Sequence, residues 1–192
     1  MTKKMKKQGG FTILESIVAI LILSLSISGV FSAVQQSLLQ ASTSKNEIKA
    51  FYLAQEAVEI IRNTRANNQL AKLNGLPNNW LNGISENSND PCYFNKVCRV
   101  DVTPVPPSLT RCSEIDNKWD SCPLLKQDPN TFLYNYDTGN NTSFKREVQI
   151  ELVKTDLSGN PIEIAVAVKI SWAEGLTPMS FKVKTLLFNW AQ

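Results

Sequence analysis

The chain of 192 residues contains no histidine. Histidine is the commonest general acid–base group near neutral pH and the commonest metal ligand, so serine–histidine and cysteine–histidine catalytic pairs are excluded. Only eight glycines are present, and they are scattered, so the sequence contains neither a P-loop nor a dinucleotide-binding glycine pattern. These absences argue against an enzyme, and we expect no cofactor and no metal site.

A net positive charge is also absent beyond the first ten residues. The formal net charge is +3, but four of the positive charges belong to Lys3, Lys4, Lys6 and Lys7, which leaves −1 for the rest of the chain. A nucleic-acid-binding domain usually presents a cluster of basic residues on one face. We therefore expect no nucleic-acid partner.

A long apolar stretch follows the basic residues. It reads FTILESIVAILILSLSISGVF from Phe11 to Phe31, and Glu15 is its only charged residue. At about 1.5 Å of rise per residue, a helix over this stretch is about 30 Å long, which is the thickness of the hydrocarbon core of a bilayer. Basic residues before a span remain in the cytoplasm. The sequence therefore predicts a single-pass protein of the cytoplasmic membrane with its body outside the cytoplasm.

Two simpler interpretations of the stretch are a plain signal anchor and a secretory signal peptide. The best position for secretory cleavage is near Ser26-Ile27-Ser28, but no clear A-x-A pattern follows the apolar run. Neither interpretation explains Glu15, because a carboxylate inside a spanning helix costs on the order of a few kcal/mol. Glu15 is therefore a candidate functional residue.

Residues Gly9 to Ser16, GGFTILES, resemble the cleavage and methylation motif of type IV prepilins and type II secretion pseudopilins. The resemblance implies that a membrane prepilin peptidase cuts between Gly10 and Phe11 and that Phe11 becomes the N-methylated terminus. It implies that Glu15 attracts the amine of a neighbouring subunit during assembly, and pairing would offset much of the cost of placing both charges in lipid. The implied partners are other pilin subunits, the prepilin peptidase and the inner-membrane assembly machinery.

The next segment predicts an amphipathic helix that continues the span and ends near Asn67-Asn68. It contains neither proline nor glycine from Ser32 to Arg65. The stretch LAQEAVEIIRNTR, Leu53 to Arg65, also resembles the second half-helix of PilV-type minor pilins. Apolar residues at three- and four-residue spacing mark the expected buried face: Ile48, Phe51, Ala54, Val58 and Ile61, with Leu53 and Ala57 beside them.

The remainder of the chain predicts a head with an antiparallel sheet. Residues 70–141 are rich in Asn, Pro, Ser and Asp, and we expect loops with short strands at Val97–Thr103 and Phe132–Tyr136. Alternating apolar residues then predict strands at Lys145–Thr155, at Ile162–Trp172 and around Phe181–Lys184. One face of such a meander must be covered, and the amphipathic helix can cover it. The expected fold class is α+β, with a long helix packed on an antiparallel sheet.

Four cysteines lie in the irregular part of this head: Cys92, Cys98, Cys112 and Cys122. An even number of cysteines in an exported region favours disulfides. Neither spacing matches the C-x2-C pattern of structural zinc, although zinc and free thiols are the alternatives. Three connectivities exist, and we expect sequential pairing because each bridge would then hold one irregular loop.

We therefore divide the chain into a cytoplasmic leader (1–10), a long helix (11–66, with the span at 11–31) and an extracytoplasmic head (67–192). We interpret it as a structural subunit, a minor type IV pilin-like protein that is processed after Gly10 and assembled through its hydrophobic helix at the cell surface. One alternative is a type II secretion or competence pseudopilin. The other is a single-span surface protein that binds a ligand through loops from Leu70 to Asn141.

Overall fold

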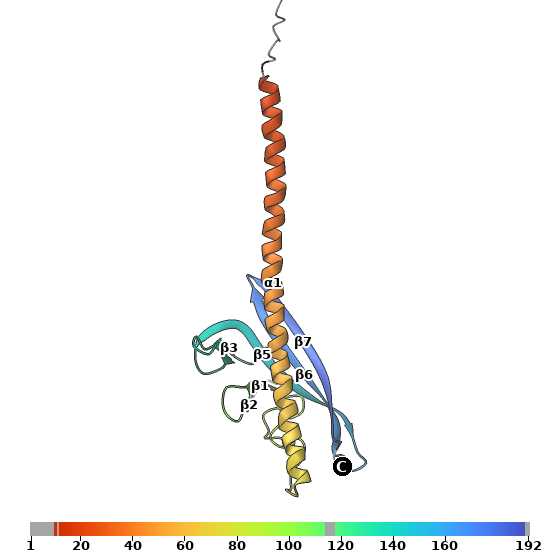
Figure 1. The fold of residues 1–192 in the computed structure, drawn as a ribbon. Coiled ribbons are helices and arrows are strands. Elements are labelled where there is room, and N and C mark those ends of the chain that lie inside the picture. Colours follow the sequence, from red (N-terminus) through yellow and green to blue (C-terminus); the bar gives the residue numbers. More distant parts are fainter. Residues whose placement is uncertain (1–9, 11, 114–117, 191–192) are drawn as a thin grey trace, which may run out of the picture. The chain divides into compact units, whose positions relative to one another are not determined.

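The computed structural model describes residue 10, residues 12–113 and residues 118–190. One long helix, α1, precedes a single antiparallel sheet, as Figure 1 shows. The fold is therefore α+β, as expected. The elements are α1 (Ile13–Leu73), β1 (Val97–Asp101), β2 (Ser108–Arg111), β3 (Leu124–Gln127), β4 (Tyr134–Asn135), β5 (Asn140–Thr155), β6 (Pro161–Glu174) and β7 (Thr177–Phe188).

The chain is divided into two compact units, and α1 contributes residues to both. One unit ends at Lys45 and contains the apolar part of α1, and the other runs from Asn46 to Gln192 and is called the head unit below. All seven strands belong to the head unit together with the second part of α1.

The helix ends later than the sequence predicts, at Leu73 and not near Asn67-Asn68. Two tertiary bonds hold this last part of α1: the Asn68 side-chain amide donates to the Asn82 carbonyl at 2.8 Å, and Gln69 donates to the Asn189 side chain at 3.3 Å. These contacts offset the low helix propensity of asparagine. The helix stops at Gly75, whose φ of +82° and bond to the Lys72 carbonyl are typical of a Schellman cap.

Strand β5 is the centre of the sheet. Along one edge it pairs with β6, which pairs in turn with β7, and this antiparallel series is the predicted meander. Along its other edge β5 pairs first with β3, through Asn140 to Lys145, and then with β1, through Val148 and Gln149. Strands β2 and β4 complete the sheet beside β1 and β3.

The irregular region contains more strand than the sequence predicts. Strands β2 and β3 are not in the prediction, because each has four residues and no clear apolar alternation. In contrast, the strand expected at Phe132–Tyr136 is reduced to Tyr134–Asn135. Phe132 has a positive φ of 59° and an exposed side chain, so it belongs to a turn.

The core lies between α1 and the face of the sheet that carries Val148, Ile150, Val166 and Val168. Five of the expected positions on the helix are buried, and the structure corrects the other two, because Ile48 and Phe51 are 58% and 50% exposed. Ala50, which the prediction did not include, is buried in the contact, and its small side chain allows the helix backbone to approach the sheet closely. The buried positions of α1 in this core are Ala50, Leu53, Ala54, Ala57, Val58 and Ile61.

Candidate processing and assembly site

Thr12 caps the N-terminus of α1. Its hydroxyl accepts a hydrogen bond from the Glu15 backbone amide at 3.3 Å, and its carbonyl accepts one from the Ser16 amide at 3.2 Å. Thr12 is therefore the N-cap residue, and the run Thr12-Ile13-Leu14-Glu15 has the T-x-x-E pattern of a capping box. Sequence analysis did not include this role, although the pattern is visible in the sequence.

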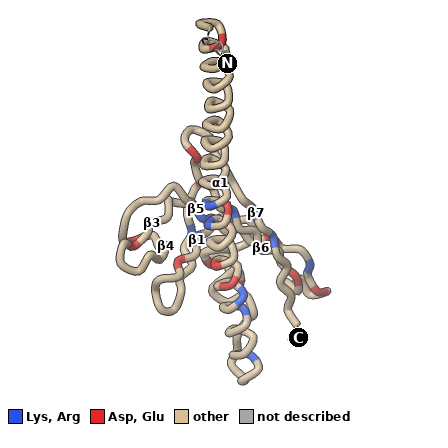
Figure 2. The backbone as a smooth tube through the Cα atoms, turned by 45° about the horizontal axis from the view of Figure 1, so that its top comes forward, with Lys and Arg blue, Asp and Glu red and all other residues tan. Residues whose placement is uncertain are grey.

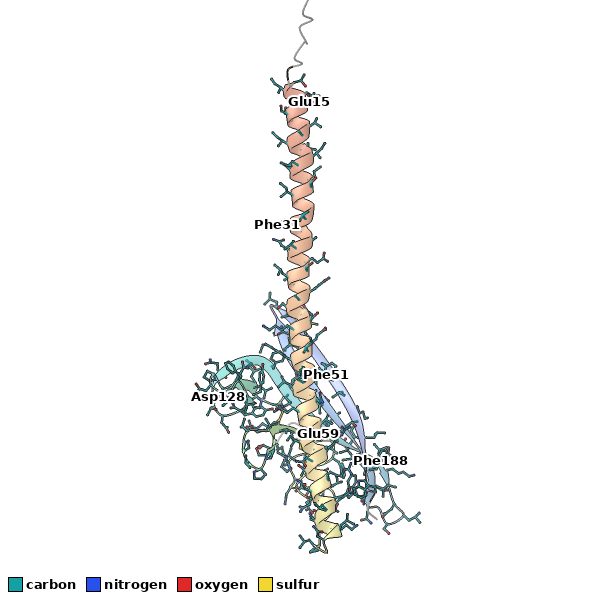
Figure 3. The ribbon with its side chains drawn as sticks, viewed as in Figure 1. Glu15, Phe31, Phe51, Glu59, Asp128 and Phe188 are labelled. Carbon is teal, nitrogen blue, oxygen red and sulfur yellow. A yellow bond between two sulfur atoms is a disulfide. The ribbon has the colours of Figure 1, made fainter. Side chains whose placement is uncertain are left out.

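Glu15 lies in the first turn of α1 with an exposed side chain (Figure 3). The unpaired amides of a helix N-terminus carry partial positive charge, so a carboxylate is favourable in this turn. It is also isolated, because no other charged residue occurs between Lys7 and Lys45. Figure 2 shows the uncharged stretch of α1 beyond this first turn. The geometry thus places one negative charge at the extreme end of an apolar helix.

The helix surface beyond Glu15 is apolar and unburied. Ile13, Leu21, Val30 and Leu39 are all more than half exposed, as are most of the large apolar residues between them. In the part of the chain that the structure describes, α1 is the one helix long and apolar enough to cross a membrane, judged by length and composition. This property fits a membrane-anchored, single-pass protein.

Several hydroxyl groups in this apolar stretch form hydrogen bonds within the helix itself. Ser26, Ser28, Ser32 and Ser37 each donate to the carbonyl four residues earlier, at 2.9 to 3.0 Å. Thr43 does the same to Leu39 at 3.2 Å. A polar group without water must find its partner inside the protein. These back-bonds therefore make the serines compatible with lipid or with a dry protein interface.

The expected scissile bond precedes this helix. Gly10 is exposed, and a side chain built on it would meet no atom within 4 Å. Phe11, the expected methylated residue, lies outside the described residues. Cleavage after Gly10 would create an amine on Phe11, four positions before Glu15 in the sequence.

The four cysteines form two disulfides in the head unit, in sequential order: Cys92 with Cys98 and Cys112 with Cys122. The bridges are adjacent, since the Cys122 sulfur lies 3.7 Å from the Cys98 carbonyl oxygen. Among the described residues no group of acidic, histidine or cysteine side chains is arranged to hold a metal ion. The Cys92–Cys98 bridge links a loop to β1, and the Cys112–Cys122 bridge closes the segment between β2 and β3.

A buried carboxylate lies beneath the second bridge. Glu147 of β5 is fully buried, and one of its oxygens accepts a hydrogen bond from the Cys122 amide at 3.2 Å. Its other oxygen has no partner among the described residues. Glu147 follows the alternation of β5, so it points to the face opposite the core. The hydrogen bond therefore places Cys122 on that face of the sheet.

Residues 5–31 match the model of the prokaryotic N-terminal methylation motif. The chain carries a type IV prepilin-like signal. The matched range contains Gly10, Phe11 and Glu15, and it does not extend into the head unit. The signal supports a pilin-like structural subunit, a class that is generally processed by a prepilin peptidase and assembled with other pilins. No curated protein and no solved structure matches the chain.

Proposed function

We propose that the chain is a minor type IV pilin-like subunit, cleaved between Gly10 and Phe11 and built into a filament through the apolar part of α1. The observation that carries the proposal is the isolation of Glu15 at the end of an exposed apolar helix. A helix that serves only as an anchor gains a modest capping and dipole benefit from a carboxylate at this place, which does not offset the cost of a charge in lipid. A helix that packs against identical or related helices gains a specific partner for an N-terminal amine.

The proposed assembly step is an electrostatic pairing in a dry environment. Cleavage leaves an ammonium on Phe11, and this group and the Glu15 carboxylate are each costly to bury alone. When the amine of one subunit lies beside Glu15 of its neighbour, both charges are compensated. The apolar surfaces of the two helices exclude water around the pair, which strengthens the attraction.

The proposal assigns a role to each part of the chain. Residues 1–10 form the cytoplasmic leader, residues 11–31 span the membrane before assembly, and the head faces away from the cytoplasm. The methyl group belongs on the amine of Phe11. The partners are other pilin subunits, a prepilin peptidase and the inner-membrane assembly machinery. The same parts would serve in a secretion or competence pseudopilus, because the matched signal does not include the head.

Two substitutions of Glu15 test the proposal. Glu15→Leu removes the charge and the capping-box side chain, whereas Glu15→Gln removes the charge and keeps a side chain that can serve the N-cap. Loss of one partner of a buried charge pair costs on the order of 3–5 kcal/mol, so we expect both variants to enter filaments at least about a hundredfold less well. Processing should continue, because Glu15 lies beyond the scissile bond.

The measurement compares the amount of subunit in sheared filaments with the amount in membranes. Thr12→Ala is the matched control, because it removes the cap hydroxyl and keeps the charge, and it should assemble almost normally. If Glu15→Gln assembles as well as the parent chain, the carboxylate has only a capping role and the assembly proposal is wrong.

A further inference from the structure

The sheet has one long edge without a neighbour. Strand β7 comprises twelve residues and pairs with β6 alone, so no described strand occupies its other edge. Strand β5, in contrast, is paired on both edges. An open edge offers a row of backbone donors and acceptors to an additional strand.

An apolar groove follows this open edge on the side that faces α1. It has a volume of about 270 Å³, and its apolar lining comes from Phe51, Ala54 and Val58 of α1 and from Phe181 and Val183 of β7. Polar residues complete its border: Gln55, Arg62, Lys184 and Thr185. The rings of Phe51 and Phe181 meet edge to face, with centroids 6.2 Å apart. Side chains of β7 alternate between half-buried on this side and exposed on the other. A strand added at the edge would place every second side chain in the groove.

The opposite side of the same edge is basic. Lys182 and Lys184 are exposed there, and Lys182 lies 4.6 Å from the Trp119 ring centroid. Lys184 contacts Glu151 at 2.6 Å but keeps a side chain that is 52% exposed. In an antiparallel pair of two β7 strands centred on Val183, Lys182 of each strand would lie opposite Lys184 of the other. Like charges in that position are destabilising, so the edge disfavours a second copy of itself.

We propose that the free edge of β7 binds an extended segment of a partner protein in which acidic residues alternate with apolar ones. The backbone of the segment would extend the sheet, its apolar side chains would enter the groove, and its carboxylates would face Lys182 and Lys184. Lysines also protect a sheet edge from pairing with arbitrary strands. Here Lys182 and Lys184 would repel a second β7 strand and attract a strand that carries carboxylates. This inference goes beyond the proposed function and does not depend on cleavage at Gly10 or on assembly through α1.

The test uses the full chain in detergent and a short labelled peptide in which glutamate alternates with valine. We expect the peptide to bind and to slow hydrogen exchange of the β7 amides. Two control peptides separate the contributions. One has lysine in place of every glutamate, and the other has the acidic sequence with alternate backbone nitrogens methylated, which prevents strand pairing. Neither control should bind measurably.

A charge reversal of the edge provides the matched variants. Lys182→Glu/Lys184→Glu should weaken binding of the acidic peptide by roughly tenfold or more and admit the lysine peptide, because both cross-strand charge pairs are inverted. Lys154→Glu alters an exposed lysine of β5 and should leave binding unchanged. Equal binding of the N-methylated peptide, protection of an edge other than β7, no binding at all, or self-association that protects β7 without peptide would each overturn the proposal.

Discussion

The guanidinium of Arg146 in β5 is fully buried and forms an ion pair with the Glu56 carboxylate of α1. It also donates to the Leu53 carbonyl of α1 at 3.4 Å and to the Val100 carbonyl of β1 at 2.6 Å. One side chain therefore connects the helix with two strands of the sheet. The Tyr136 hydroxyl adds a bond to the Arg146 carbonyl at 3.2 Å.

This relationship predicts that Glu56→Leu destabilises the head unit by about 2 kcal/mol or more, because it leaves the Arg146 cation buried without its counter-charge. The double variant Glu56→Leu/Arg146→Met should recover part of the loss, since it removes the cation as well. Urea unfolding of the full chain in detergent, followed by tryptophan fluorescence, measures the free energy of unfolding of both variants.

Glu59→Leu is the control one turn away. Its ion pair with Arg62 is long, at 3.8 Å, and exposed, so its loss should lower the free energy of unfolding by less than about 0.5 kcal/mol. Equal costs for Glu56→Leu and Glu59→Leu would contradict the prediction.

Processing should be visible in the mass of the N-terminal peptide. In cells with an active prepilin peptidase, protein extracted from membranes should begin at methylated Phe11. Gly10→Val should block cleavage, because a branched side chain would crowd a peptidase site that accepts glycine. Gly29→Val is the control, since a side chain at either glycine meets no atom of this chain within 4 Å. Recovery of intact Met1 from the parent chain is the result that would rule out processing.

The cysteines should resist alkylation until a reductant is added, because no described cysteine is free. Under mild reduction we expect the Cys112–Cys122 bridge to open first. Cys112 is half-buried, whereas Cys92 and Cys98 are fully buried. Alkylation followed by peptide mapping identifies the order. Labelling of all four thiols without reductant would exclude both bridges, and labelling of Cys92 and Cys98 first would contradict the expected order.

A glycine pair tests how tightly the β4–β5 connection packs on β3. Gly139 has a φ of +100°, and a side chain there would lie 2.2 Å from the Gln127 carbonyl oxygen. Gly159 also has a positive φ, of +85°, but meets no atom within 4 Å. Gly159→Ala should therefore cost about 1 kcal/mol for the backbone conformation alone, and Gly139→Ala clearly more. Thermal unfolding of both variants measures the difference in stability. Similar losses of stability would show that the β3 backbone shifts readily to admit the methyl group.

The sequence predicted the parts of the fold that depend on local pattern. The alternation in β5 and β6 and the spacing of apolar residues in α1 identified the sheet and the helix that covers it. The prediction failed where tertiary contacts determine the bounds of an element. The helix passes through Asn67 and Asn68 because Asn82 and Asn189 bond to its last turns, and no local pattern reports such partners.

The choice of buried helix face shows the same limit. Size and hydrophobicity favoured Ile48 and Phe51, but close packing against the sheet requires the small side chain of Ala50. Buried charged residues were missed for a similar reason. Arg146 and Glu147 are neighbours in a strand that alternates well around them, and both are buried through partners that are distant in the sequence. In the candidate site, Gly10, Phe11 and Glu15 came from a linear motif, which a sequence displays in full.

The serine back-bonds of α1 have a consequence for how a subunit could change its surroundings. A helix that leaves lipid for a protein neighbour must normally trade one set of polar contacts for another, and each exchange adds to the barrier. Because Ser26, Ser28, Ser32 and Ser37 carry their acceptors with them, their hydroxyls meet both environments in the same state. Within this part of the helix the carboxylate of Glu15 is then the group whose energy differs most between the two media. In the proposed assembly, the charges at the end of the helix, and not the hydroxyls along it, would then distinguish the two media.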